Sequence, residues 1–84
     1  MEEKLVGEIT HFYGKIDVAI VKLQDTLKEG DTIHIKGNST DFNQVIDSIQ
    51  IEHQNVKQAK KGEMIGIKVA NQVKEGDKVY IVKE

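Results

Sequence analysis

The residues that could do chemistry are few and are spread along the chain. His11, His34 and His53 are its histidines, and no two of them stand at the HxH or HxxxH spacing of paired metal ligands. Cysteine is absent, so the chain has no thiol nucleophile and no thiolate ligand for zinc. A metal site would need two histidines helped by Asp41 or Glu52, and we expect none. His34, between two isoleucines, is expected to be a solvated strand position.

Catalytic motifs are also missing. Ser39 and Ser48 do not stand in a GxSxG nucleophile elbow. The glycines form neither GxxxxGK[ST] nor GxGxxG, the patterns that cradle nucleotide phosphates. We therefore expect no enzyme, no catalytic residue, no cofactor and no nucleotide.

Two small groups of residues could bind a partner. Lys57, Lys60 and Lys61 gather within five positions, and Tyr13 stands close to Lys15 at a turn. Lysines beside an exposed aromatic side chain suit RNA, because the cations meet phosphates and the ring stacks on a base. The net charge of −2 and the absence of arginine argue against a strongly basic footprint, so a solvated, non-binding surface stays open as an alternative.

The composition describes the framework that would hold these residues. The 84 residues suffice for one domain, 1–84, and 38% of them are apolar, mostly Ile and Val, whose branched side chains favour strands. No apolar run is long enough to cross a membrane, and the first residues lack the pattern of an export signal. The sequence predicts an all-β protein of the cytoplasm.

One turn pattern occurs three times. Each copy has an apolar anchor, two charged residues, a glycine and an acidic residue, followed by a strand: Leu27 to Asp31, Ala59 to Glu63 and Val73 to Asp77. Glycine tolerates the positive φ of a tight turn, and the acid can accept bonds from local backbone N–H groups. The predicted structural turn residues are Gly30, Asp31, Gly62, Glu63, Gly76 and Asp77.

The remaining pattern gives the other elements. A first strand should carry a bulge at Gly7, and a hairpin turn near Gly14 should lead into a central strand, 16–23, that is buried on both faces. A long strand over 41–53 should bend near Asp47 and Ser48. Asn55 as a cap and Gly62 as a stop predict one short helical turn between them. With strands at 64–69 and 78–83, the expected fold is a six-stranded closed antiparallel β-barrel.

The order of these turns is similar to that in a known family. The segment 48–67, preceded by 27–33 and followed by 73–76, resembles the second domain of elongation factor Tu and other translational GTPases, the translation-protein β-barrel. A closer resemblance is to the small C-terminal barrel of the collagenase-like peptidases, which include tRNA-hydroxylation proteins, and to free-standing translation elongation factor-like proteins. It is carried by the segments 40–42, 49–53, 66–69 and 75–80.

This resemblance implies a barrel without the peptidase domain. In elongation factor Tu the barrel helps to hold the aminoacylated end of tRNA, and the matching positions here are Gln50, Glu52, His53 and Met64. The family's Glu and Asn are replaced by Gln50 and Met64, and an Arg by His53. The leading expectation is a non-catalytic module that binds tRNA, another RNA or a ribonucleoprotein through Tyr13, Lys15, Gln50, Glu52, His53, Lys57, Lys60 and Lys61. The alternative is an interaction module that serves a separately encoded collagenase-like peptidase.

Overall fold

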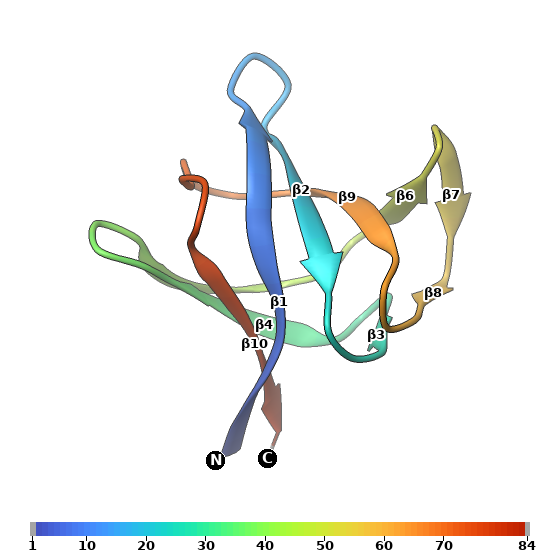
Figure 1. Cartoon of the computed structure of the whole chain (residues 1–84), viewed down its shortest axis with the longest axis horizontal. Coiled ribbons are helices and arrows are strands. Elements are labelled where there is room, and N and C mark those ends of the chain that lie inside the picture. Colours follow the sequence, from blue (N-terminus) through green and yellow to red (C-terminus); the bar gives the residue numbers. More distant parts are fainter. Residues whose placement is uncertain (1, 84) are drawn as a thin grey trace.

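The chain folds entirely from strands and turns in a computed structural model that describes residues 2–83. No helix occurs among these residues, so the predicted all-β class is confirmed. The strands, labelled in Figure 1, are β1 (Glu2–Tyr13), β2 (Val18–Leu23), β3 (Leu27–Lys28), β4 (Thr32–Lys36), β5 (Asp41–Val45), β6 (Ile49–Ile51), β7 (Gln54–Val56), β8 (Gln58–Ala59), β9 (Met64–Lys68) and β10 (Lys78–Lys83).

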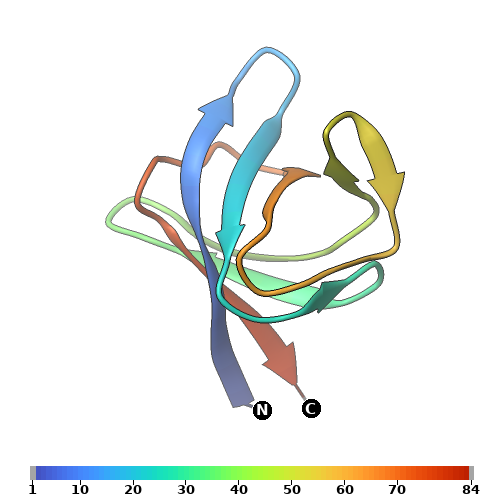
Figure 2. The ribbon, with the colours of Figure 1, turned by 45° about the vertical axis from the view of Figure 1, so that its right-hand side comes forward.

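Eight strands form one sheet in the order β5-β4-β10-β1-β2-β9-β6-β7, and every neighbouring pair is antiparallel. The two short strands β3 and β8 pair with each other separately. The sheet curls strongly around its own inner face, and β1 and β10 bring both ends of the chain to one end of the molecule (Figures 1 and 2). The β1–β2 turn lies at the opposite end.

The core is made of the aliphatic side chains on the inner face of the curled sheet. Alternation along β2 and β9 sends every second residue inward, so that Ala19, Val21, Ile65 and Ile67 are buried. Aromatic rings contribute only at the margin, where Phe12 and Phe42 pack against the core while staying partly exposed. The buried apolar residues are Val6, Ile9, Ala19, Val21, Leu23, Leu27, Ile33, Ile35, Ile46, Ile49, Ala59, Ile65, Ile67, Val69, Val73 and Val79.

The first strand carries the predicted irregularity. Its register with β10 shifts between Leu5 and Gly7, which confirms the bulge expected there. A Cβ on Gly7 would lie 2.6 Å from Val21 Cγ1 and 2.9 Å from the Lys22 carbonyl oxygen, so β2 can approach only a glycine at this point. The bulge lets Val6 and Ile9 both reach the core.

The three repeated segments form the same turn. Gly30, Gly62 and Gly76 have φ values of 92°, 89° and 92°, a region that a Cβ disfavours. In each copy the acidic side chain accepts a bond from the N–H group three residues earlier, at 2.9, 2.7 and 2.9 Å. Each turn is also held by two backbone bonds to one buried residue of another segment, namely Ile46, Leu23 or Ile9.

The predicted helical turn between Asn55 and Gly62 is wrong. Asn55 lies in β7, where it pairs with Gln50, and Ala59 lies in β8, where it pairs with Leu27. The residues with capping chemistry therefore serve a short hairpin and a turn. Strand pairing satisfies their backbone groups, so a helix is not needed.

The barrel also differs from the expected one. The long strand over 41–53 breaks at 46–48, close to the predicted bend, and gives β5 and β6. These two pieces lie in different parts of the sheet, and β5 and β7 end it without a backbone ladder between them. The Gln44 side chain of β5 instead donates to the Lys68 carbonyl oxygen at 2.9 Å and accepts from the Ala70 N–H group at 2.8 Å. Side-chain bonds thus link β5 to the end of β9.

Candidate functional site

An apolar hollow lies over the outer face of β2, β9 and β6. In Figures 1 and 2 the β1–β2 turn stands on one side of β9 and the β6–β7 hairpin on the other. We call this hollow, of about 520 Å³, the hairpin groove. Its lining residues are Tyr13, Ile16, Val18, Ile20, Gln50, Glu52, His53, Met64, Ile65 and Gly66.

The groove collects apolar side chains that the fold leaves uncovered. Four large apolar residues are exposed in the described part of the chain, and three of them line the groove: Tyr13 (48% exposed), Ile16 (61%) and Met64 (48%). Val18 and Ile20 on β2 are half-buried beside them. The prediction of a strand buried on both faces is therefore wrong for its outer face, which is apolar but open. A contiguous apolar patch on a soluble protein typically marks an interaction surface.

The two turns that flank the groove hold unusual backbone conformations. Asp17 in the β1–β2 turn has a φ of 55°, and Glu52 and His53 in the β6–β7 turn have φ values of 50° and 65°. These are the non-glycine residues with positive φ in residues 2–83, and such residues are held at an energetic cost of about 1–2 kcal/mol each. Strain of this kind gathers at ligand-binding sites. Here Glu52 and His53 line the groove, and Asp17 lies in the turn beside it.

The polar side chains of the groove come from β6 and the turn after it. The Gln50 side-chain amide donates to Asn55 Oδ1 at 3.2 Å, which holds it across the β6–β7 hairpin. Glu52 and His53 are exposed at the turn. Glu52 is the one acidic residue of the lining, and no lysine belongs to it. The arrangement is an apolar floor with a carboxylate at one wall.

The structure separates the predicted binding residues into two groups. Tyr13, Gln50, Glu52 and His53 line the groove together, and Lys15 lies in the β1–β2 turn beside it. The predicted cluster Lys57, Lys60 and Lys61 is exposed but does not line the groove. Lys61 lines a different hollow, with Glu8 and Lys22. Lys57, Lys60 and Lys61 thus do not join Tyr13 in one continuous surface around this groove.

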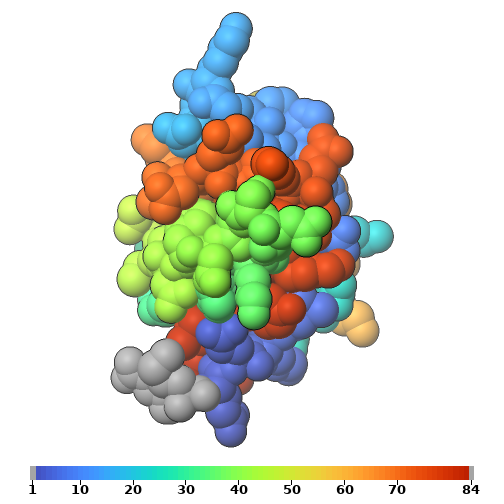
Figure 3. Space-filling view, turned by 90° about the vertical axis from the view of Figure 1, so that its left-hand side faces the viewer, coloured from blue at the N-terminus to red at the C-terminus, as the bar shows by residue number. Residues whose placement is uncertain are grey.

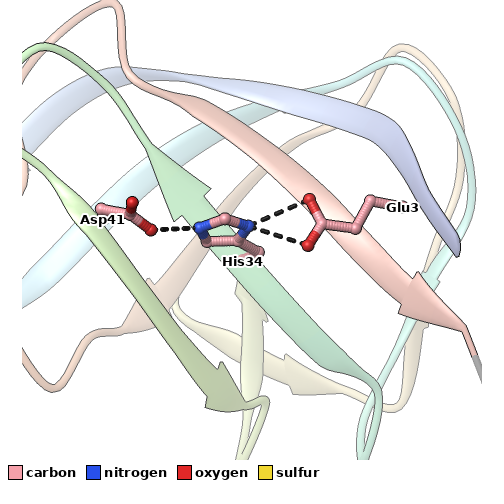
Figure 4. Close-up of polar contacts among 3 residues, drawn as sticks. All are labelled: Glu3, His34 and Asp41. Carbon is pink, nitrogen blue, oxygen red and sulfur yellow. Dashed lines mark hydrogen bonds and ion pairs between the residues drawn. The ribbon is translucent and has the colours of Figure 1, made fainter. Parts of the chain in front are cut away.

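A second polar cluster lies on the face formed by β4, β5 and β10, which Figure 3 shows as green segments next to red ones. His34 of β4 stands between two carboxylates (Figure 4). Its Nδ1 atom lies 2.9 and 3.0 Å from the Glu3 oxygens, and its Nε2 atom is hydrogen-bonded to Asp41. The bonds to Asp41 and Glu3 raise the pKa of His34 above its ordinary value of 6.5.

This cluster corrects the sequence-based view of His34. Its side chain points outward as predicted, yet it is only 14% exposed, because neighbouring strands and the two carboxylates cover it. Both ring nitrogens are hydrogen-bonded to carboxylate oxygens, so neither is left to bind a metal ion. Among residues 2–83 no group of three or more His, Cys, Asp or Glu side chains has an arrangement that could hold a metal. His34 is best described as a structural clamp.

Other titratable side chains form isolated surface pairs. Lys4 contacts Asp25 and lowers the pKa of its carboxyl group. Lys78 contacts Glu8 at 2.7 Å, and His11 lies 3.5 Å from a Glu75 oxygen. Residues 2–83 contain no helix that could span a lipid bilayer.

Sequence reasoning missed the apolar half of the groove. The sequence predicts that Ile16, Val18 and Ile20 are covered, and it does not indicate Gly66 as a site residue. Two features of the sequence could have indicated an open site: the apolar residues on the outer face of β2, and a glycine, which has no side chain, in the middle of β9. The pattern of apolar residues along a strand cannot distinguish a face that is covered by the protein's own chain from a face that is left open for a partner.

Comparison with known proteins adds evidence about the fold. The chain is 46% identical over 80 residues to an uncharacterized protease of Methanocaldococcus jannaschii, a match that covers 94% of this chain. The same match covers 20% of that protease, so the chain spans about a fifth of its length. No family model matches the chain.

Solved structures show the same fold. The C-terminal domain of a Geobacillus thermoleovorans protein assigned to the U32 peptidases superposes with a TM-score of 0.90 at 18% identity, covering 95% of this chain and 93% of that one. The selenomethionine variant of that domain superposes with a TM-score of 0.87 at 19% identity, covering 90% of this chain and 96% of that one. These likenesses agree with the resemblance to collagenase-like peptidases. The resemblance to translation factors has no match among them and stays a prediction.

Proposed function

We propose that this chain is a non-catalytic interaction module that serves a U32-type peptidase and binds it through the hairpin groove. The observation that carries the proposal is the gathering of Tyr13, Ile16 and Met64 in one groove. The curled sheet, in which Gln44 of β5 is bonded to the end of β9, is the scaffold that holds the two flanking turns. Any hydrolytic chemistry stays with the partner.

The groove has the features of a protein-binding surface. Apolar side chains that a partner covers contribute roughly 25 cal/mol for each Å² removed from water. Tyrosine and other large apolar side chains carry much of the affinity in such interfaces, and a polar rim surrounds them. Gln50, Glu52 and His53 supply such a rim on the β6–β7 side.

RNA binding is the second candidate, and the charges of the groove disfavour it. A phosphate in the groove would meet the Glu52 carboxylate and no lysine of the lining. Lys57, Lys60 and Lys61 could still contact RNA elsewhere on the surface. Binding there would not use the apolar groove, which would then have no occupant.

Calorimetry with two purified ligands tests the proposal: the U32-type peptidase of the same organism, and its total tRNA. We expect the peptidase to bind, with an affinity that changes little between low and high salt, because apolar contacts are not screened. Binding of tRNA that weakens steeply with salt, without binding of the peptidase, would establish the RNA alternative. Binding of neither ligand at low salt would overturn both.

A further inference from the structure

Gly66 is the residue of the groove that the fold itself does not require. It lies in the interior of β9, paired with Ile20 of β2 on one side and Gln50 of β6 on the other. Glycine in a strand interior is destabilising by roughly 0.5–1 kcal/mol relative to alanine. A glycine at such a position often marks a close approach by a ligand or by another backbone.

Most other glycines have reasons within the fold; the exception is Gly14 near the tip of the β1–β2 hairpin, where a Cβ would contact only Phe12 Cε2 at 3.5 Å. Gly30, Gly62 and Gly76 have positive φ, and a Cβ on Gly37 would collide with Asp77 at 1.9 Å. On Gly66, by contrast, a Cβ would meet only ordinary contacts: Val18 Cγ1 at 3.5 Å, Ile20 Cδ1 at 3.6 Å and the Gln50 carbonyl oxygen at 3.9 Å. Neither backbone conformation nor internal packing therefore demands a glycine here.

We propose that Gly66 is the seat for one bulky apolar side chain of the partner polypeptide, and that Glu52 receives a basic group next to it on the same segment. This inference rests on the proposed function of the groove. Val18 and Ile20 form the apolar floor around the bare Gly66 backbone, and Met64 stands beside it on the same strand. The volume of about 520 Å³ lies in the range of about 300–1,000 Å³ typical of ligand sites.

The charge of the residues that line the hairpin groove indicates what kind of partner segment can bind there. Glu52 is exposed and carries the only carboxylate or ammonium group among the lining residues. An apolar side chain followed by Lys or Arg complements an apolar floor beside a carboxylate, whereas a phosphate would be repelled. The occupant is therefore a segment of protein, and an RNA strand is an outcome for the test to exclude.

The test uses substitutions that occupy the space above Gly66 and are expected to leave the fold unchanged. Gly66→Ala and Gly66→Val add one and three carbon atoms over the groove floor, at a position where the new Cβ makes ordinary contacts. Asn43→Val places the same branched side chain on an exposed position of β5, away from the groove, and is the matched control. Glu52→Gln removes the charge while keeping the shape of the side chain.

The probe is the purified U32-type peptidase, titrated into the ¹⁵N-labelled chain and followed by the amide signals and by calorimetry. We expect the signals of Gly66, Val18 and Ile20 to shift or broaden in the wild type. Gly66→Val should weaken binding at least about tenfold, Gly66→Ala less, and Asn43→Val not at all. Glu52→Gln should weaken binding about threefold at low salt and remove the small salt dependence that one exposed charge pair gives.

The outcomes separate this inference from the proposed function. If the wild type binds through the groove but Gly66→Val binds equally well with an unchanged melting temperature, the seat at Gly66 is overturned and the groove stands. If the wild type binds the peptidase with no change at groove amides, or binds only tRNA, the proposed function itself fails. A lower melting temperature for Gly66→Val would show that the fold does need this glycine, which also overturns the inference.

Discussion

The Nδ1 atom of His34 lies 2.9 Å from the Oε2 oxygen of Glu3, although their strands β4 and β1 are separated by β10. The Glu3 side chain therefore reaches across the intervening strand. Asp41 of the edge strand β5 holds the other ring nitrogen. One imidazole thus joins β1 and β5, on either side of the β10–β4 pair, and Tyr80 of β10 lies near it with ring centroids 6.4 Å apart.

Stability should depend on pH through this clamp. The pKa of His34 is raised in the folded chain by Asp41 first and Glu3 second, so its contribution is complete below 6.5, the ordinary value, and is lost as pH rises through the folded pKa. We expect the free energy of unfolding to fall as pH rises above 6.5, measured by urea denaturation. His34→Gln should be destabilised by about 1 kcal/mol at low pH and should lack this step. An identical pH profile in the variant would contradict the clamp.

The same substitution should have opposite effects at two glycines. Gly76→Ala places a Cβ at a φ of 92° and should lower the free energy of unfolding by about 1–2 kcal/mol. Gly66→Ala in the interior of β9 should raise it by about 0.5 kcal/mol. Thermal denaturation of the two variants beside the wild type measures both changes. Equal losses would show that Gly66 is also a structural requirement.

We expect the acidic residue of the repeated turn to contribute more to the free energy of unfolding where its side chain is buried. Asp77 and Asp31 each accept a backbone bond of 2.9 Å in their own turns, but Asp77 is buried whereas Asp31 is partly exposed. Asp77→Ala removes a buried carboxylate and leaves the N–H group of Lys74, whose bond is part-buried, without its partner, and it should cost about 1–3 kcal/mol. Asp31→Ala should cost less, because water can replace the carboxylate. Chemical denaturation of both variants compares them directly, and a larger loss for Asp31→Ala would refute this assignment.

Side-chain bonds should hold the open edge of the sheet. Gln44→Ala removes both contacts between β5 and the end of β9, and it should cost about 1–2 kcal/mol and speed hydrogen exchange at the Ala70 amide. Asn43→Ala, exposed on the same strand, is the control and should change little. Unchanged exchange at Ala70 in the Gln44 variant would mean that packing alone holds β5 against the end of β9.

Sequence reasoning reached the local features of this fold and missed the non-local ones. The glycine of each repeated turn and the bulge at Gly7 follow from one residue and its neighbours. The segment around Asn55 and Ala59 carries the residues of a helix cap, but its strand partners, Gln50 and Leu27, lie on other segments. Capping residues give no information about such distant partners. The two-residue pairing of β3 with β8 carries no local pattern at all.

The candidate site was reached in part for a similar reason. The sequence indicates four separate residues, and the fold brings them around one groove: Tyr13, Gln50, Glu52 and His53. The apolar residues Ile16 and Val18 were assigned to the core, since hydrophobicity does not reveal whether a face meets its own chain or a partner.

The most direct test compares two exposed apolar side chains in binding to the U32-type peptidase. Met64→Ser truncates a residue of the groove, and Val45→Ser truncates one that is equally exposed but lies elsewhere. We expect calorimetry to show binding about tenfold weaker for the Met64 variant, unchanged binding for the Val45 variant, and nearly unchanged melting temperatures for both. Equal affinities for wild type and both variants, or a loss confined to the Val45 variant, would contradict a partner seated in the hairpin groove.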